Sequence, residues 1–209
     1  MSTPLTLYYR PGTCALSPHI VLLWTGLEHD AVNASRRGDY VAINPNDAVP
    51  ALLIEGEGVL TQCNAVLNYL AKRAERDDLL GGPSHRGQAE VDQWNAFFTG
   101  DFHPAFYAFF APKRYTTTRD KQAQAETSAA GAALVRSGLD TLEAHLSTRT
   151  YMVGEALTTA DAFAFPMLRW VAFVVPSGRA EWPSVQAYYE RVSADPGVLA
   201  AMGVHGIEA

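Results

Sequence analysis

Apolar residues in the first third of the chain recur with strand and helix spacing in turn. An apolar run of strand length covers Leu5–Tyr9, and 15–25 has the spacing of a helix that ends at Gly26. A weaker strand pattern lies at 31–34. The pattern therefore predicts a strand–helix–strand unit at the start of the chain.

Two further apolar runs lie on either side of a Gly-rich turn. The first covers 49–54, the second covers 59–61, and the turn between them is 55–58. Such a pair predicts a β-hairpin. Residues 65–73 then carry apolar side chains with helical spacing, so we expect a mixed sheet flanked by helices.

The rest of the chain is predicted to be helical, and it opens with an aromatic stripe. Large apolar side chains recur there every three or four residues, at Val91, Trp94, Phe98, Phe102 and Phe106. Pro104 falls inside this stripe, and its ring conflicts with the carbonyl of Gly100. A kink at His103 is therefore predicted.

Three more helices are expected after the stripe. Residues 119–146 are Ala-rich and carry leucines on one side, at Leu139, Leu142 and Leu146. Thr158–Asp161 has the capping-box pattern and opens the apolar helix 163–175, in which Pro166 predicts a bend. A last helix is expected over 185–192, between two prolines. This half is therefore predicted to contain five or six helices.

The clearest linker, Gly81–Ser84, separates the alternating pattern from the helical one. With 209 residues, the chain is long enough for two small domains that each have a core. We expect a first domain at 1–80, a linker at 81–87 and a helical domain at 88–209.

Composition and charge exclude several classes of function. The chain is 48% apolar and 18% charged, its net charge is −6, and no basic stretch exceeds a pair of arginines, so no nucleic-acid partner is expected. The longest apolar run, 162–175, contains an arginine and is too short to span a membrane, and the N-terminus lacks the pattern of a signal peptide. Two cysteines do not make a disulfide framework, and a cytoplasmic location is expected. The histidines and cysteines lack metal-ligand spacing, so we expect no metal.

Cys14 follows the first predicted strand and a Pro-Gly turn, close to the start of the first helix. Unpaired N–H groups and aligned peptide dipoles at a helix start favour an anion, and so lower the pKa of a thiol placed there. We favour a helix that begins at Cys14, whereas Ser17 and Pro18 would begin it three residues later. Ser17 replaces the second cysteine of a C-x-x-C pair, so turnover would need an external small thiol. The alternative is that Cys14, like most lone cysteines, is a small buried hydrophobe.

Three other positions carry weaker signals. Pro50 begins a strand, and a cis Val49–Pro50 bond would turn the backbone of Val49 toward a peptide-like ligand, although an ordinary trans bond is the alternative. Gln62 and Cys63 lie at a strand-to-helix junction, where N–H groups either hold a carboxylate or are simply capped. His103 is either a core residue of the stripe or a group that stabilises a thiolate.

Four segments together resemble the cytosolic glutathione S-transferases, most closely their bacterial, cysteine-containing beta class. In chain order they are YYRPGTCALSPHIVL, NPNDAVPALL, LTQCNAVLNYLA and TTADAF. The resemblance covers the whole chain and implies an α/β plus all-α fold. A thioredoxin-like domain with a βαβαββα-like mixed sheet would be followed by an all-helical domain, and the protein would be a homodimeric glutathione transferase.

The resemblance also implies roles for the residues around the thiol. Cys14 matches the thiol that contacts the sulfur of glutathione, and Tyr9 matches a nearby tyrosine. Val49 would bind the cysteinyl backbone of glutathione, with Pro50 in the cis form. Gln62 and Cys63 would hold the γ-glutamyl carboxylate.

The remaining implied roles concern the helical half and the rim of the site. His103 matches a histidine that faces the thiol, and Asp101 matches an acid that reaches the partner subunit's glutathione. Arg36 or Arg37 would contact the glycine carboxylate of glutathione. Aromatic side chains would line the pocket for the second substrate, among them Tyr9, Phe102 and Phe106.

Such a protein could catalyse either of two reactions, or it could belong to a different functional class. In conjugation, the thiolate of glutathione attacks an apolar electrophile and Cys14 assists, whereas in thiol–disulfide exchange Cys14 is itself the nucleophile. Cys63 replaces a hydroxyl donor and Pro104 replaces a lysine of the family pattern. These departures motivate the alternative, a protein of the same fold that binds glutathione, an apolar ligand or a protein partner without turnover.

Overall fold

A four-stranded sheet forms the first part of the molecule. The structure is a computed structural model that describes residues 4–208. Its strands are β1 (Leu5–Tyr9), β2 (His29–Asn33), β3 (Ala51–Ile54) and β4 (Gly58–Thr61), in the spatial order β2-β1-β3-β4. β1 pairs parallel to β2 and antiparallel to β3, and β3 pairs antiparallel to β4. The predicted strand–helix–strand unit, hairpin and mixed sheet are confirmed.

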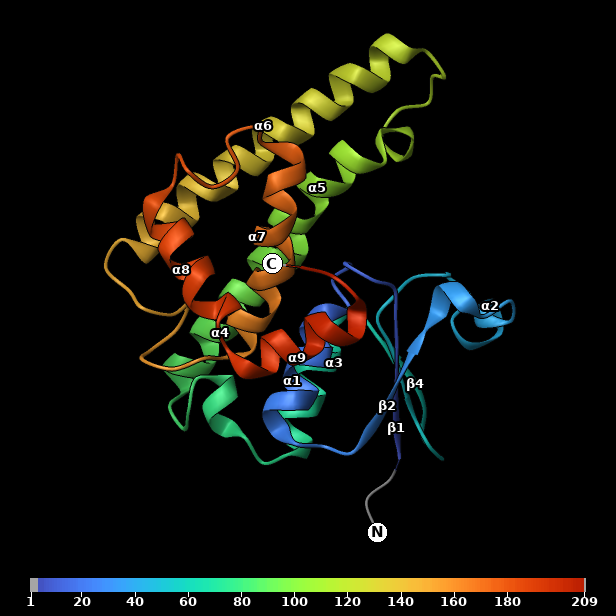
Figure 1. Cartoon of the computed structure of the whole chain (residues 1–209), viewed down its shortest axis with the longest axis vertical. Coiled ribbons are helices and arrows are strands. Elements are labelled where there is room, and N and C mark those ends of the chain that lie inside the picture. Colours follow the sequence, from blue (N-terminus) through green and yellow to red (C-terminus); the bar gives the residue numbers. More distant parts are fainter. Residues whose placement is uncertain (1–3, 209) are drawn as a thin grey trace.

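Helices cover both faces of this sheet. α1 (Leu16–Thr25) and α3 (Cys63–Arg73) lie between the sheet and the helical part, and the short α2 (Tyr40–Ile43) lies beyond the opposite face (Figure 1). Leu7 of β1 belongs to the main core on the α1 side, whereas its neighbour Tyr8 packs with Tyr40 in a smaller cluster. This division follows from the alternation of side chains along a strand.

The start of α1 differs from both predicted positions. The helix begins at Leu16, so the favoured start at Cys14 is wrong, as is a start at Ser17. The N–H groups of Leu16 and Ser17 bond to the carbonyls of Thr13 and Cys14, each at 3.1 Å. These three-residue offsets make a tight turn that leads into the helix, and Cys14 lies in that turn.

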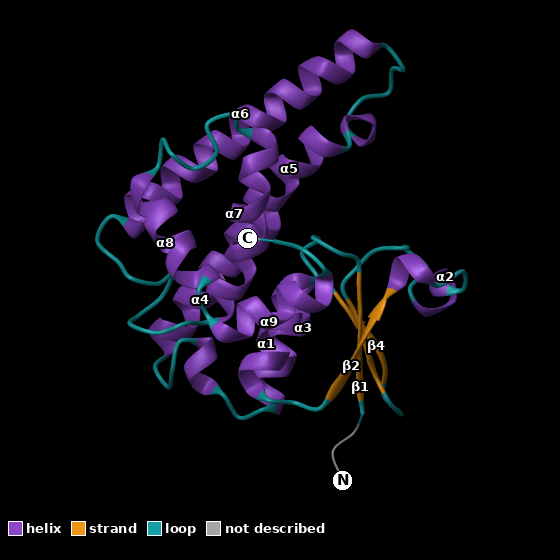
Figure 2. Ribbon diagram, in the orientation of Figure 1, coloured by secondary structure: helices purple, strands orange, loops and turns teal. Residues whose placement is uncertain are grey.

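The second part of the molecule is helical throughout (Figure 2). Its helices are α4 (His85–Phe97), α5 (His103–Phe110), α6 (Lys121–Leu146), α7 (Thr159–Val174), α8 (Pro183–Ser193) and α9 (Pro196–His205). Short 3-10 turns lie at η1 (Ala34–Arg36), which follows β2 in the sheet part, at η2 (Asp77–Leu80), which precedes α4, and at η4 (Pro112–Arg114), which follows α5. The described residues thus hold six α-helices in this part, within the predicted five or six. α4 begins inside the segment 81–87 that the sequence predicts as a linker, and the domain boundary stays a proposal.

The sequence pattern does not predict α9, because the last helix that it predicts covers 185–192. Pro196 was expected to terminate a helix, but it occupies the first turn of a new one, where its missing N–H costs nothing. Asp195 caps this turn by accepting from the N–H groups of Gly197 and Val198, at 2.9 and 3.0 Å. α9 then packs against α1 (Figure 1).

The aromatic stripe is buried as predicted, and it contains an irregular turn. Its five members, Val91, Trp94, Phe98, Phe102 and Phe106, are all buried. The predicted kink takes the form of a π-helical turn, η3 (Phe98–Phe102), after which the N–H of His103 bonds to the carbonyl of Phe98, five residues back. Such a turn accommodates Pro104, which has no N–H to give to the helix.

α7 is the buried centre of the helical part. Its predicted capping box is present, and the carboxylate of Asp161 also accepts hydrogen bonds from the N–H of Met152 and the hydroxyl of Tyr188, at 2.9 and 2.8 Å. Pro166 lies inside this single helix. Between residues 4 and 208, no helix combines the length and the apolar character needed to cross a membrane.

α5 and α6 lie in close contact at Gly131. A Cβ at this position would lie 2.7 Å from the backbone nitrogen of Phe109 and 2.9 Å from the carbonyl oxygen of Ala105. Because these are backbone atoms, they cannot rotate away. Gly131→Ala is therefore expected to lower the free energy of unfolding by about 1–3 kcal/mol, measured by denaturant titration.

Gly203→Ala in α9 is the matched control for this prediction. A Cβ there has no heavy atom within 4 Å in the described part of the chain, and alanine favours a helix over glycine. The control should leave stability equal or raise it slightly. Similar effects of the two substitutions would contradict the close α5–α6 packing.

Candidate active site

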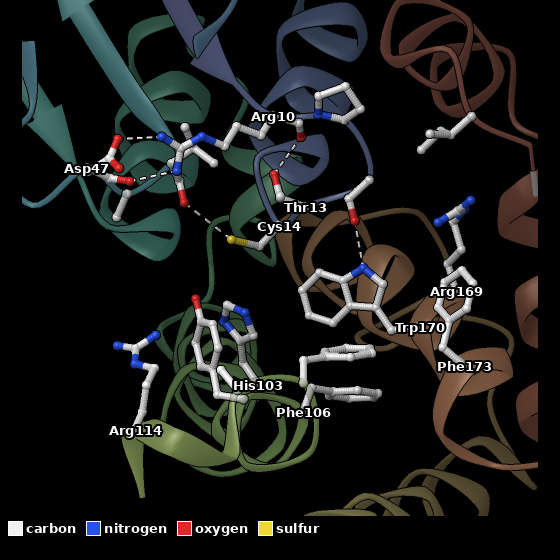
Figure 3. Close-up of a pocket in the computed structure, with 18 of the residues that line it drawn as sticks. Arg10, Thr13, Cys14, Asp47, His103, Phe106, Arg114, Arg169, Trp170 and Phe173 are labelled. Atoms are coloured by element: carbon white, nitrogen blue, oxygen red, sulfur yellow. Dashed lines mark hydrogen bonds and ion pairs between the residues drawn. The ribbon is translucent and has the colours of Figure 1, made fainter. Parts of the chain in front are cut away.

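A pocket of about 850 Å³ lies between the sheet part and the helical part (Figure 3). Its polar side consists of the loop after β1 and the segment before β3, including Arg10, Thr13, Cys14, Asp47 and Val49. Its aromatic side consists of residues from α5 and α7, including His103, Phe106, Tyr107, Phe110, Trp170 and Phe173. The volume and the mixture of apolar walls with a few polar groups are typical of a small-molecule site.

The loop that carries Cys14 is held on the helical part. Gly12 turns the chain with a φ of +71°, a conformation that suits glycine, and its carbonyl accepts a 2.7 Å hydrogen bond from the indole N–H of Trp170. The hydroxyl of Thr13 donates to the carbonyl of Arg10 at 2.7 Å. These bonds fix the position of Cys14 relative to α7.

The thiol of Cys14 points to the backbone of Val49. Its S–H donates to the carbonyl oxygen of Val49, with a sulfur–oxygen distance of 3.6 Å. The Val49–Pro50 peptide bond is cis, as the family resemblance implies. Cys14 and Val49, which the resemblance assigns to different parts of glutathione, therefore lie in contact at one wall of the pocket.

The predicted acidity of Cys14 is wrong in this structure. Cys14 is buried, with 5% of its surface exposed, and burial raises the pKa of its thiol to about 12. Desolvation disfavours the thiolate, and the first turn of α1 begins two residues beyond the sulfur-bearing residue. At neutral pH the group is a thiol that donates a hydrogen bond.

Cys63 lies next to Cys14, and its side chain does not line the pocket. The Cys63 S–H donates to the carbonyl oxygen of Cys14 at 3.6 Å, and burial raises the pKa of the Cys63 thiol as well. The S–H of Cys63 is therefore already engaged in a hydrogen bond within the protein. Gln62 precedes it at the start of α3 with a φ of +71°, exposed and outside the residues that line the pocket.

His103 lies in the wall of the pocket on the helical side (Figure 3). Its ring stacks on Tyr107 with centroids 4.5 Å apart and lies 5.1 Å from the ring of Trp170. Burial lowers the pKa of His103 to about 4, so the imidazole is neutral at pH 7. The structure places it in the same pocket as Cys14, but a neutral ring does not supply the positive charge that would stabilise a thiolate.

Tyr9 faces away from the pocket. Its hydroxyl donates to the carbonyl of Val204 at 3.1 Å, and its ring stacks on His205 with centroids 4.1 Å apart. Tyr9 thus joins the sheet to α9 and lies outside the candidate site. Phe102 also lies outside it, against Gly138 of α6, whereas Phe106 lines the pocket as expected.

Two further predicted residues lie apart from Cys14. Arg36 is exposed in η1 and does not line the pocket, and Arg37 forms an ion pair with Asp39. Asp101 is exposed in η3, at a separate hollow between α5 and α6. The structure therefore brings together Cys14, Val49, His103 and Phe106, and it does not bring the other predicted site residues into this pocket.

Sequence reasoning missed the charged residues of the pocket. Arg10 donates to the carbonyl of Asp47 at 2.7 Å and forms an ion pair with its carboxylate. Arg114 follows α5, and Arg169 precedes Trp170 in α7. The signal available in the sequence was that Arg169 interrupts the apolar run 162–175. Over residues 4–208, no group of His, Cys, Asp and Glu side chains could hold a metal ion.

Two protein-family models match the chain. The glutathione S-transferase N-terminal domain matches residues 3–72, and the glutathione S-transferase C-terminal domain matches residues 124–191. The two matches agree with the sheet part and the helical part of the structure. The predicted α/β plus all-α architecture, with a thioredoxin-like first part, is therefore confirmed.

Full-length relatives agree with these matches. The chain is 37% identical over 207 residues to glutathione S-transferase GST-4.5 of Xanthomonas campestris, with 96% of this chain and 98% of that protein covered. The structure of a sphingomonad glutathione S-transferase complexed with glutathione is 31% identical, with a TM-score of 0.82 and coverage of 97% and 100%. The bacterial beta class enzyme of Sphingomonas chungbukensis is 29% identical, with the same TM-score and coverage. This chain therefore belongs to the glutathione S-transferase family and is similar to its beta class, as predicted.

Proposed function

We propose that the protein is a glutathione transferase that places the sulfur of glutathione beside Cys14. The observation that carries this proposal is the contact between the Cys14 thiol and the Val49 carbonyl, at a pocket with an aromatic opposite wall. A similar sphingomonad enzyme has been solved as a complex with glutathione. A bound tripeptide would put its thiol between the polar side and the aromatic side.

The backbone of Val49 is the proposed partner of the cysteinyl unit of glutathione. An extended peptide pairs with the edge of an extended segment through main-chain hydrogen bonds. The start of α3 lies next to Cys14 through Cys63, and its unpaired N–H groups favour an anion. We propose that the γ-glutamyl carboxylate lies there, beside Gln62, and that it is held by the backbone because the thiol of Cys63 is already used.

Conjugation is the chemistry that the site favours. The thiolate of glutathione attacks an electrophilic carbon and forms a carbon–sulfur bond, the leaving group departs with its bonding electron pair, and the thiol proton passes to solvent. Cys14, with its pKa raised to about 12, would stabilise this thiolate by turning its one S–H from the carbonyl of Val49 to the sulfur of glutathione. Thiol–disulfide exchange through Cys14 would instead need that buried thiol to ionise, so we rank it second.

The assembly and location follow the family resemblance and are part of this proposal. We propose a homodimer in which Asp101 reaches the glutathione of the partner subunit, because Asp101 is exposed and lies away from the pocket of its own chain. We also propose a cytoplasmic location, where thiols stay reduced. The domains would be 1–80 and 88–209, joined through 81–87.

Alkylation of Cys14 tests the raised pKa directly. Because the thiolate is the reactive form, its alkylation rate by iodoacetamide should rise about tenfold for each pH unit between about pH 7 and about pH 10, without a plateau. Mass spectrometry of the Cys14 peptide measures this rate separately from that of Cys63. A plateau below about pH 8 would indicate an acidified thiol and contradict the prediction.

Two substitutions at Cys14 separate the two chemistries. Cys14→Ala removes the donor and should lower the conjugation rate by at most about tenfold, the value of one neutral hydrogen bond, whereas Cys14→Ser keeps a donor and should retain more activity. Both variants should lose glutathione-dependent reduction of a mixed disulfide. The measurement is kcat/KM for each reaction, with Cys63→Ser as the control.

The opposite pattern would overturn this assignment. Loss of conjugation in both variants, with glutathione still bound, would contradict a role of Cys14 that is limited to donating one hydrogen bond. A protein that is retained on immobilised glutathione but has no activity with electrophiles or disulfides would support the binding-protein alternative.

A further inference from the structure

We propose that the second substrate is an aromatic electrophile that carries a negative charge, and that Arg114 and Arg169 select it. This inference rests on the proposed glutathione transferase function. It is carried by two arginines that lie at the aromatic side of the pocket without a carboxylate partner among the described residues. They are specificity-determining residues in this proposal.

The charges that line the pocket leave an excess of positive charge. Among the described lining residues, Asp47 is the only acid, and its carboxylate is paired with Arg10. His103 is neutral at pH 7 because burial lowers its pKa to about 4. Among residues 4–208, no carboxylate is therefore paired with Arg114 or Arg169, although the whole chain has a net charge of −6.

Each arginine lies over an aromatic ring of the pocket. The guanidinium carbon of Arg114 is 4.9 Å from the ring centroid of Tyr107, and that of Arg169 is 5.7 Å from the ring centroid of Phe173. Figure 3 shows Arg114 and Arg169 at opposite sides of the view, with Phe106 and Trp170 between them. Stacking of this kind orients the flat group and leaves N–H donors at its edge for an anion.

The aromatic surface between the arginines is available to a ligand. Phe110 and Phe173 are 49% and 59% exposed, so both rings are accessible to a ligand. The rings of Phe106 and Trp170 lie deeper and meet edge to face, with centroids 5.4 Å apart. A planar aromatic substrate can therefore stack on this wall while its charged group reaches an arginine.

The positions of the arginines distinguish this role from glutathione binding. Arg114 and Arg169 belong to η4 and α7 of the helical part, whereas Cys14 and Val49 belong to the opposite, polar side. Arg169 is anchored through its Nε, which donates to the carbonyl of Glu208 at 2.7 Å. Its two terminal nitrogens are the groups that would reach the substrate.

A matched pair of substrates tests the proposal. With chlorodinitrobenzene or chlorodinitrobenzoate, the glutathione thiolate forms a bond to the ring carbon that carries chlorine, chloride departs with the bonding electrons, and the thiol proton passes to solvent. The compounds differ in one carboxylate. The readout is the ratio of kcat/KM for the charged substrate to kcat/KM for the neutral one. Each value is first divided by the rate constant of the uncatalysed reaction, which removes the difference in intrinsic reactivity.

Substitution of the arginines should reduce this ratio. Arg114→Gln and Arg169→Gln should each lower it about threefold and the double variant about tenfold, as expected for partly exposed charges. Arg149→Gln is the matched control, because it removes an equal charge from an exposed position that does not line the pocket. Raising the salt concentration from about 0.05 M to about 0.5 M should lower the ratio in the wild type more than in the double variant.

Two kinetic results would overturn the proposal. One is an unchanged ratio in the double variant. The other is an equal loss with both substrates accompanied by a higher KM for glutathione, which would assign the arginines to glutathione and leave the proposed function intact.

A binding measurement decides the matter if the protein turns over neither substrate. Nitrobenzoate and its neutral isostere nitrobenzamide do not react, and their binding can be followed by quenching of the fluorescence of Trp170, using Trp170→Phe as the reference. Tighter binding of nitrobenzoate that is lost in the double arginine variant supports the proposal. Equal affinities for the two compounds in the wild type would refute it.

Discussion

The hydrogen bond from the Cys14 thiol to the Val49 carbonyl is the contact around which the site is built. It joins the loop after β1 to the segment before β3, two parts of the chain that the sheet topology brings side by side. The indole of Trp170 holds the same loop from the other side through the carbonyl of Gly12. The position of the thiol therefore depends on the packing of the sheet part against α7. The site forms only when the two parts of the chain are folded against each other.

Burial determines the chemical character of this site more than charge does. It raises the pKa of Cys14 to about 12 and lowers that of His103 to about 4, so both groups are neutral at pH 7. A neutral thiol donates a hydrogen bond to an incoming thiolate, and a neutral imidazole adds to an aromatic wall. The site is consequently suited to orient a nucleophile that glutathione brings, with net positive charge supplied by arginines at its rim.

Local patterns in the sequence predicted the elements that local chemistry determines. The strand Leu5–Tyr9, the hairpin and the capping box at Thr158–Asp161 depend on alternation, turn residues and neighbouring side chains, and all are present. α9 was missed because a proline ends one helix and begins another with the same local signal. The role expected for Tyr9 did not hold, because the partner of its hydroxyl is on α9, and only the tertiary structure places that helix against β1. The acidity expected for Cys14 was wrong for a similar reason, since helix position is local and desolvation is not.

A crystal structure of the protein with glutathione measures the central claim most directly. The account predicts that the cysteinyl backbone of glutathione pairs with the backbone of Val49 and that its sulfur lies within about 4 Å of the Cys14 sulfur, without a covalent bond between them. Glutathione bound elsewhere in the pocket, or a disulfide between it and Cys14 in protein kept under reducing conditions, would contradict the account.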